Sequence, residues 1–400
     1  MEFIDLKAQF RRVEPRIRAR MDAVLAHGRF VMGPEVGELE ARLAALAGAK
    51  HCLTCASGTT ALDLVLMAWN IGPGDAVFTT PLTFVATAES IARTGATPVF
   101  ADIGADYNMD VSLLEPTIEA VLRQNGAWPL PKAAKREKLR PRAVIPVDLF
   151  GSPADYDALL PVARKYDLLV LEDAAQGFGG SYRRRPLCGC GCHAATTSFF
   201  PAKPLGCYGD GGAVFTDDGG LAALVDSLRY HGRIDARNKN DNARLGLNGR
   251  MDTLQAAVVL AKLEVFADEL EARREAASRY AELLRTVPGV APPPAPVNGL
   301  STWAQYTLLL PAGTDRARVM KTLLAAGIPT AVNYPKGLHV QGAFAGLGHA
   351  AGDFPRAADA AARVLSLPMH PYLDAATQER IVEILRSALD LKSALEESAC

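Results

Sequence analysis

The sequence predicts an α/β fold built on a mostly parallel sheet, and three features lead to this prediction. Short apolar or β-rich runs alternate with amphipathic segments through the first 230 residues. A long amphipathic stretch, 252–286, follows, and the proline-rich segment 288–297 separates it from a shorter α+β region. Strands that alternate with helices favour a parallel sheet with helices on both faces, because parallel strands need long crossover connections.

The elements of the first region follow from the apolar runs and from residues that start helices. Residues 5–27 and 34–47 are expected to be helices, and Pro34 beside Glu35 suits the first turn of the second. Strands are expected at 51–56, 75–80, 97–102, 143–149, 168–172, 195–200 and 212–216. Helices are expected between most of them, at 59–69, 83–94, 110–124, 153–166 and 219–230.

The second region is expected to form a smaller unit of its own. Its predicted elements are a strand at 303–310, a helix at 314–326, a strand at 328–334 and a helix at 374–391. The long helices of 252–286 carry the chain from one unit to the other. The sequence therefore predicts a large domain of residues 1–260 and a small C-terminal domain of residues 261–400.

Residues 125–142 read as an insertion between a helix and a strand, because they are rich in proline and in basic side chains. A solvated surface loop is the simplest interpretation. A contact with a nucleotide phosphate or with a partner protein is the alternative.

Composition excludes several classes of protein. With 43 basic and 44 acidic residues, a net charge of −1 argues against a chain that mainly coats nucleic acid or an anionic membrane. No apolar run reaches the roughly 18 residues of a membrane helix, and the charged N-terminus does not resemble a signal peptide. A cytoplasmic protein is expected. Cys188, Cys190 and Cys192 have C-x-C-x-C spacing with no convincing second ligand pair, so we expect no metal.

The first candidate for chemistry is the segment 57–60 (SGTT), which follows an expected strand and opens an expected helix. Ser57 or Thr59 can cap this helix, and Gly58 lets a ligand approach the backbone closely. Free amides at a helix N-terminus form an anion site. Taken alone, the segment is equally consistent with a capped helix that binds nothing.

Two further segments follow strand ends in the same way. The stretch 172–176 (EDAAQ) ends the very apolar strand 168–172, where its carboxylates can meet a ligand or cap a helix. Ser198 lies in the expected strand 195–200, and Lys203 follows this strand in a loop that contains Gly206, Gly209, Gly211 and Gly212. Such a density of glycine is typical of a tightly turned loop near a ligand.

Together these residues match what pyridoxal phosphate needs from a protein. Lys203 supplies the amine that binds the aldehyde covalently, and Asp173 the carboxylate that keeps the pyridine nitrogen protonated. The phosphate would be held by Gly58, Thr59 and Ser198, and the ring would lie between Phe84 and Ala175.

The chain also resembles the DegT/StrS-type aminotransferases from Phe3 to about Pro371, with 125–142 as an extra segment. The similarity is closest at 197–212 (TSFFPAKPLGCYGDGG). This resemblance implies a fold-type I transferase with a mostly parallel seven-stranded sheet, which acts on nucleotide-linked keto sugars with glutamate as the donor. Within the family, that stretch most resembles enzymes that aminate UDP-2-acetamido-2-deoxy-3-oxo-glucuronate for bacterial O-antigens.

The resemblance assigns further roles by position. Gln176 matches the residue that contacts the ring hydroxyl, and Asn248 an asparagine that reaches the phosphate across a homodimer interface. Arg250 matches an arginine that reaches the substrate from the partner subunit, and a guanidinium suits a carboxylate. An interface salt bridge is the alternative for Arg250. Tyr334 matches a tyrosine at the sugar site, where Asn333 stands in place of a histidine found in similar members.

Three other functions stay open at this point. The acceptor can be a 4-keto-6-deoxy sugar instead of a 3-keto uronate. A non-catalytic regulator that only binds the cofactor is a second alternative, although Lys203, Asp173 and Gln176 are all present. A nucleic-acid-binding protein that uses the basic residues of 132–142 and 183–185 is the third, and the near-neutral charge argues against it.

Overall fold

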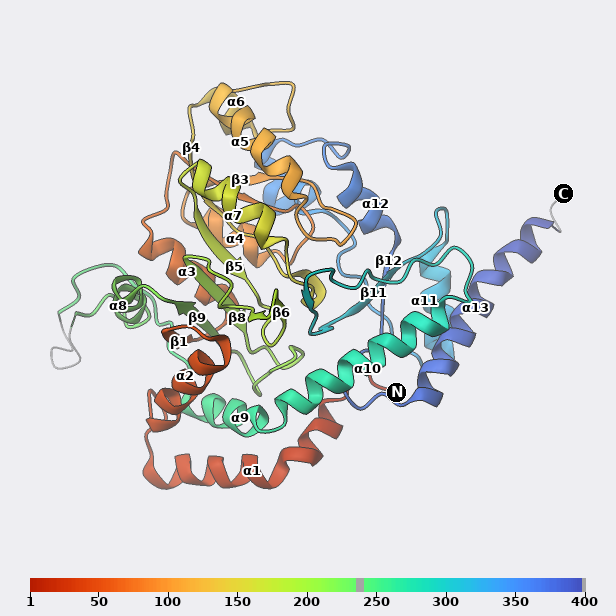
Figure 1. The fold of residues 1–400 in the computed structure, drawn as a ribbon, viewed down its shortest axis with the longest axis horizontal. Helices are drawn as coiled ribbons and strands as arrows, with labels where there is room; N and C mark the ends of the chain where they lie inside the picture. The colour runs from red at the N-terminus through yellow and green to blue at the C-terminus, as the bar shows by residue number, and fades with distance from the viewer. Residues whose placement is uncertain (235–240, 398–400) are drawn as a thin grey trace.

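A seven-stranded sheet organises the first 230 residues of the computed structural model, which describes residues 1–234 and 241–397 (Figure 1). Its strands are β1 (His51–Cys55), β2 (Asp75–Thr79), β3 (Thr97–Phe100), β4 (Arg140–Val144), β5 (Leu169–Asp173), β8 (Ala194–Ser198) and β9 (Gly212–Thr216). They lie in the order β1-β9-β8-β5-β4-β2-β3, and β9 alone runs antiparallel to its neighbours. The expected mostly parallel seven-stranded sheet is thus confirmed, strand by strand.

Side chains alternate between two apolar layers, as a sheet covered on both faces requires. On β9, for example, Val214 faces one layer while Ala213 and Phe215 face the other. Helices α3 (Gly58–Ala68), α4 (Ala86–Arg93) and α8 (Gly219–Leu228) cover the first face. Helices α2 (Pro34–Ala47), α5 (Leu114–Arg123), α7 (Tyr156–Lys165) and α9 (Thr253–Leu263) cover the second.

The N-terminal helix α1 (Leu6–His27) lies against α9 along the outside of this layer (Figure 1). Val13 and Ile17 of α1 pack on Val258 and Ala261 of α9. Pro15 lies inside the helix, and Asp5 caps its start by accepting a hydrogen bond from the amide of Ala8 at 2.7 Å.

The C-terminal region forms a second apolar core. Strands β11 (Tyr306–Leu309) and β12 (Val364–Leu367) pair antiparallel and pack with α10 (Phe266–Leu284), α11 (Arg316–Ala325) and α13 (Ala375–Glu397). Phe266 and Leu270 of α10 still pack in the core of the large sheet, whereas Ala276 to Leu284 pack in the second core. The division at residues 260 and 261 stays a prediction.

One expectation for this region was wrong, and one strand was not predicted. Residues 328–334 do not form a strand, because only Ala331 makes a bridge, to Ser366, in the described chain. The strand is instead β12, which follows the helix α12 (Pro355–Arg363) directly. The apolar run 328–334 ends in the polar pair Asn333–Tyr334, and both residues border a cavity at the edge of the large sheet.

The expected insertion at 125–142 is shorter than predicted. It contains a short helix α6 (Lys132–Arg136), and residues 140–142 already belong to β4. The expected strand 143–149 is correspondingly displaced, because β4 ends at Val144. Two-residue strands β6 (Ser181–Tyr182), β7 (Arg185–Pro186) and β10 (Gly299–Leu300) make a small separate sheet. No helix in the described ranges is long and apolar enough to cross a membrane.

Candidate active site

A cavity of about 600 Å³ opens at the carboxyl edge of the large sheet, where ligands of α/β folds bind. The ends of β5 and β8, the start of α3 and the segment before α4 line one side, and residues 304–305 and 333–334 of the C-terminal region line the other. The residues expected at this edge meet here: Gly58, Thr59, Phe84, Asp173, Ala175, Gln176, Ser198, Lys203, Asn333 and Tyr334.

Asp173 is the buried carboxylate of the cavity. It ends β5, and its Oδ2 accepts a hydrogen bond from the hydroxyl of Thr87 at 2.8 Å. Its Oδ1 accepts one from the amide of Ala175 at 3.2 Å. Burial raises the pKa of Asp173, and these hydrogen bonds and the nearby Lys203 act against that rise. The carboxylate is therefore held in one orientation, with a cation nearby.

Lys203 is the residue with an amine among those described that line the cavity. Burial lowers the pKa of this lysine to about 8, while the charge of Asp173 acts to raise it. Part of the amine is then neutral near physiological pH, and the neutral form is the nucleophile. Lys203 lies in what we call the lysine loop, residues 199–211, which the Phe199 amide closes by donating to the Gly211 carbonyl at 2.7 Å.

The start of α3 forms an anion cradle beside Ser198. Ser57 caps the helix by accepting a hydrogen bond from the amide of Thr60 at 3.0 Å. The amides of Gly58 and Thr59 are in the first turn, where they have no partner within the helix. A Cβ at Gly58 would lie 2.7 Å from the Cβ of Ser198, so only glycine lets α3 approach the end of β8 this closely.

The amide of Gln176 has a fixed orientation. Its Oε1 accepts a hydrogen bond from the Phe150 amide at 2.5 Å, which leaves its Nε2 to donate, here to the hydroxyl of Tyr334 at 3.4 Å. Burial raises the pKa of Tyr334, so its phenol stays neutral. The ring of Phe84 lies 6.3 Å from that of Tyr334, and Asn333 donates to the hydroxyl of Ser366 at 3.2 Å.

Two predicted residues do not line this cavity within one chain. Asn248 is exposed and pairs with Tyr230 through the backbone. The guanidinium of Arg250 lies 5.3 Å above the ring of Tyr230. Neither residue is among those that border the cavity.

The structure also adds residues that the sequence did not indicate. Thr87, in the first turn of α4, fixes Asp173. Gln305 borders the cavity with a buried Oε1 that has no hydrogen-bond partner in the described chain, and Asp210 of the lysine loop borders it as well. The position of Thr87 in the first turn of the helix that follows β2 was a usable signal, but nothing in the local sequence marks Gln305.

The cysteine cluster serves the packing around β5. Glu172, the neighbour of Asp173, is buried and accepts a hydrogen bond from the amide of Cys188 at 2.6 Å, so it caps no helix. Burial raises the pKa of the thiols of Cys188, Cys190 and Cys192, which makes them poor nucleophiles. The described residues contain no cluster of three potential metal ligands.

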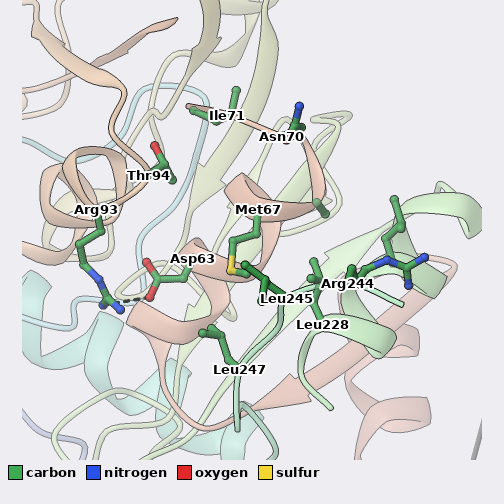
Figure 2. A pocket seen from close by; sticks show the side chains of 12 residues that line it. Asp63, Met67, Asn70, Ile71, Arg93, Thr94, Leu228, Arg244, Leu245 and Leu247 are labelled. Carbon is green, nitrogen blue, oxygen red and sulfur yellow. Dashed lines mark ion pairs between the residues drawn. The ribbon is translucent and has the colours of Figure 1, made fainter. Parts of the chain in front are cut away.

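A second cavity, of about 520 Å³, borders the later turns of α3, and none of the described residues that line it is a lysine (Figure 2). Apolar side chains such as Met67, Leu228 and Leu247 line much of it. Its carboxylate, Asp63, forms an ion pair with Arg93 at 3.0 Å. The cavity at the carboxyl edge is therefore the candidate for catalysis.

A lysine and a carboxylate that share one cavity at the edge of this sheet are the arrangement of an aminotransferase. The chain belongs to the DegT/DnrJ/EryC1/StrS aminotransferase family, whose model matches residues 12–386. It is 45% identical to the UDP-2-acetamido-2-deoxy-3-oxo-D-glucuronate aminotransferase of Pseudomonas aeruginosa, over 97% of this chain and 99% of that protein.

Solved structures confirm the fold. An aminotransferase of the same family from Brucella abortus superimposes with a TM-score of 0.87 at 44% identity, over 97% of this chain and 99% of that one. The NtdA protein of Bacillus subtilis, which has the cofactor PMP bound, superimposes with a TM-score of 0.81 at 26% identity. That match covers 94% of this chain and 82% of the other.

Proposed function

We propose that the protein is a pyridoxal-phosphate-dependent aminotransferase that transfers the amino group of glutamate to the keto carbon of a nucleotide-linked sugar. UDP-2-acetamido-2-deoxy-3-oxo-D-glucuronate is the proposed acceptor, as for the relative from P. aeruginosa. The observation that carries the proposal is the presence of Lys203 and Asp173 in one cavity at the carboxyl edge of the sheet. Overall, the amino group of glutamate and the keto oxygen of the sugar exchange places, which yields 2-oxoglutarate and an amino sugar.

The cavity fits the cofactor. When bound, pyridoxal phosphate acts as an electron sink for the carbon that bears the amino group. The first amides of α3, at Gly58 and Thr59, and the hydroxyl of Ser198 would hold the phosphate. Phe84 and Ala175 border the space that the ring would occupy. The Phe150 amide fixes Gln176, whose Nε2 faces Tyr334 here and would donate to the ring hydroxyl.

Lys203 and Asp173 divide the acid–base work. As an ionised carboxylate, Asp173 would accept a hydrogen bond from the protonated ring nitrogen, and the hydroxyl of Thr87 fixes the orientation of that carboxylate. The Nζ of Lys203 would hold the cofactor covalently. Its neutral amine would also serve as the base that takes a proton from the donor carbon and as the source that returns a proton to the acceptor carbon. A pKa of about 8 suits both directions of transfer near neutral pH.

The charges around the cavity support a homodimer with shared active sites. Both proposed substrates are anionic. Among the described residues that border the cavity, Lys203 is the one basic side chain. Further cations must come from elsewhere, and Arg250 is held outside the cavity of its own chain. Arg250 of a second copy would bind a substrate carboxylate, and Asn248 of that copy would reach the phosphate. Tyr334 and Asn333 would face the sugar from the C-terminal region.

A comparison of acceptors tests the proposal. The purified protein, loaded with pyridoxal phosphate and supplied with glutamate, is offered the 3-oxo-glucuronate nucleotide and a 4-keto-6-deoxy sugar nucleotide. We expect a kcat/KM at least about 100-fold higher for the uronate, because a bidentate ion pair to its carboxylate is worth a few kcal/mol. A preference for the 4-keto sugar would remove the uronate assignment and leave the aminotransferase intact.

A further inference from the structure

Lys262 is a buried lysine that has no place in the chemistry described so far. It lies on α9 with 1% of its surface exposed, and its Nζ has no hydrogen-bond partner in the described chain. Lysine is almost never fully buried unless it is paired, because an ammonium group loses its hydration on burial. A lysine in this position calls for an explanation.

The close contact of the ammonium group is an aromatic ring. The Nζ of Lys262 lies 4.3 Å from the centre of the Tyr208 ring, within the range of a cation–π interaction. The nearest carboxylate that acts on it, Glu269, is occupied by other donors: Gln9 at 2.7 Å and the hydroxyl of Tyr372. The Tyr208 ring is therefore the direct partner of Lys262.

Tyr208 belongs to the lysine loop. Its amide donates to the Oε1 of Gln255 at 2.8 Å. Gln255 and Lys262 are seven residues apart on α9, so both lie on one side of the helix, below the loop. The helix thus holds Tyr208 at two points, with Gln255 on its backbone and Lys262 on its ring.

The loop transmits the position of Tyr208 to Lys203 because it is short and tightly closed. The amide of Cys207 donates to the Phe199 carbonyl at 2.7 Å, and that of Lys203 to the Phe200 carbonyl at 2.9 Å. A Cβ at Gly206 would lie 2.5 Å from the carbonyl oxygen of Pro201. With so little free space, a displaced Tyr208 moves the backbone between it and Lys203.

We propose that Lys262 is a positioning residue for the aminotransferase reaction, which holds Lys203 in place by binding the Tyr208 ring from beneath the lysine loop. The inference rests on the proposed role of Lys203. Lys262 does not touch the cavity, so it acts on the proton transfer only through the loop. Its loss is expected to lower kcat while the KM for glutamate changes little.

Replacing Lys262 with methionine separates positioning from structural support. Exchange of a buried cation that has no hydrogen-bond partner for an apolar side chain of similar length is expected to change stability little, because the desolvation penalty is lost together with the cation–π contact. We expect Lys262→Met to keep the thermal midpoint of wild type and to lose about 10-fold in kcat, since small misplacements of a catalytic group are costly. Lys165→Met, which removes an exposed lysine paired with Glu115, is the matched control and should keep wild-type kinetics.

Variants of Tyr208 test the same contact from its other side. Tyr208→Phe keeps the ring face and should retain wild-type kcat, whereas Tyr208→Leu removes the face and should reproduce the loss in Lys262→Met. The double variant Lys262→Met/Tyr208→Leu should be no slower than either single variant, because both break the same contact. Tyr208 is 38% exposed, so its replacement tests the proposal even where Lys262→Met fails to fold.

The outcomes are distinct. Wild-type kcat in Tyr208→Leu, or losses that multiply in the double variant, would overturn the positioning role. An equal loss in Tyr208→Phe would show that the hydroxyl matters and not the ring face, and it would overturn the role as well. A wild-type protein that does not react with glutamate at all contradicts the proposed function instead, which the same assay reveals before any variant is compared.

Discussion

Asp173 is a buried carboxylate whose neighbours act against the effect of burial on its pKa. Burial alone favours the protonated acid, but Thr87 and the Ala175 amide donate to both carboxylate oxygens, and Lys203 adds a nearby positive charge. All three interactions favour the ionised form. The proposed hydrogen bond to a ring nitrogen needs that form, so the supporting groups belong to the proposed active site.

Removal of the Thr87 hydroxyl tests this support. Thr87→Val keeps the side-chain shape and deletes the donor at 2.8 Å, so the pKa of Asp173 rises further above its ordinary value. The carboxylate must be ionised to act, and the acid limb of the pH–kcat profile therefore moves to higher pH. We expect kcat at neutral pH to fall about 10-fold, because the loss of one hydrogen bond to a charged group costs a free energy that corresponds to about this factor in rate.

Thr79→Val is the control for that variant, because its hydroxyl donates to the Ile145 carbonyl at 2.9 Å and is equally buried in the sheet. It should change stability and leave the pH profile in place. An acid limb that does not move in Thr87→Val would show that Asp173 is not the group that titrates.

At the scale of single residues, the sequence predicted the part of the site that follows strand ends. Lys203, Asp173, Ser198 and Gly58 were found because the carboxyl ends of neighbouring parallel strands meet at one edge. Gln305 could not be found in this way, since it enters the cavity from the C-terminal region through tertiary packing. The role proposed for Lys262 could not be predicted either, because its apolar neighbours in the sequence indicate only a helix.

At the scale of elements, all seven strands of the large sheet were predicted, because buried parallel strands form short apolar runs between helices. The C-terminal region was predicted less well. Strand β12 follows α12 without an intervening turn residue, so no local signal separates the two. The apolar run at 328–334 lacks a partner over most of its length, and a strand needs a partner as well as a pattern.

The segment between Gly246 and Asp252 carries the prediction of shared active sites. Its Asn248 and Arg250 do not border the cavity of their own chain. A dimer of one Lys203→Ala chain and one Arg250→Ala chain would then have one intact site and one site that lacks both groups. We expect this heterodimer, isolated through two different affinity tags, to show about half of the wild-type activity while each parent is inactive.

The control pairs a Lys203→Ala chain with a Lys203→Ala/Arg250→Ala chain, a combination that leaves no intact site and should stay inactive. An inactive first heterodimer would place Arg250 in the site of its own chain or outside catalysis. Failure to isolate any heterodimer from co-expressed chains would contradict the dimer itself.

At the scale of the whole molecule, the cavity lies where the C-terminal region meets the carboxyl edge of the sheet. Residues of both regions line it, and the lysine loop is held from below by α9, which leads from one region to the other. The near-zero net charge is compatible with anionic substrates, because local groups can bind them without a basic surface. The cofactor, the proton carrier Lys203 and the acceptor sugar are thereby proposed to share one cavity.

The most direct test of the account follows the visible absorbance of the protein loaded with pyridoxal phosphate. Wild type should show the band of the lysine-bound cofactor, and glutamate should abolish it with one equivalent of 2-oxoglutarate formed per site. Lys203→Ala should lack that band and give no 2-oxoglutarate in the same time. If wild type and Lys203→Ala had the same spectrum and the same response to glutamate, the assignment of Lys203, and with it the proposed mechanism, would be wrong.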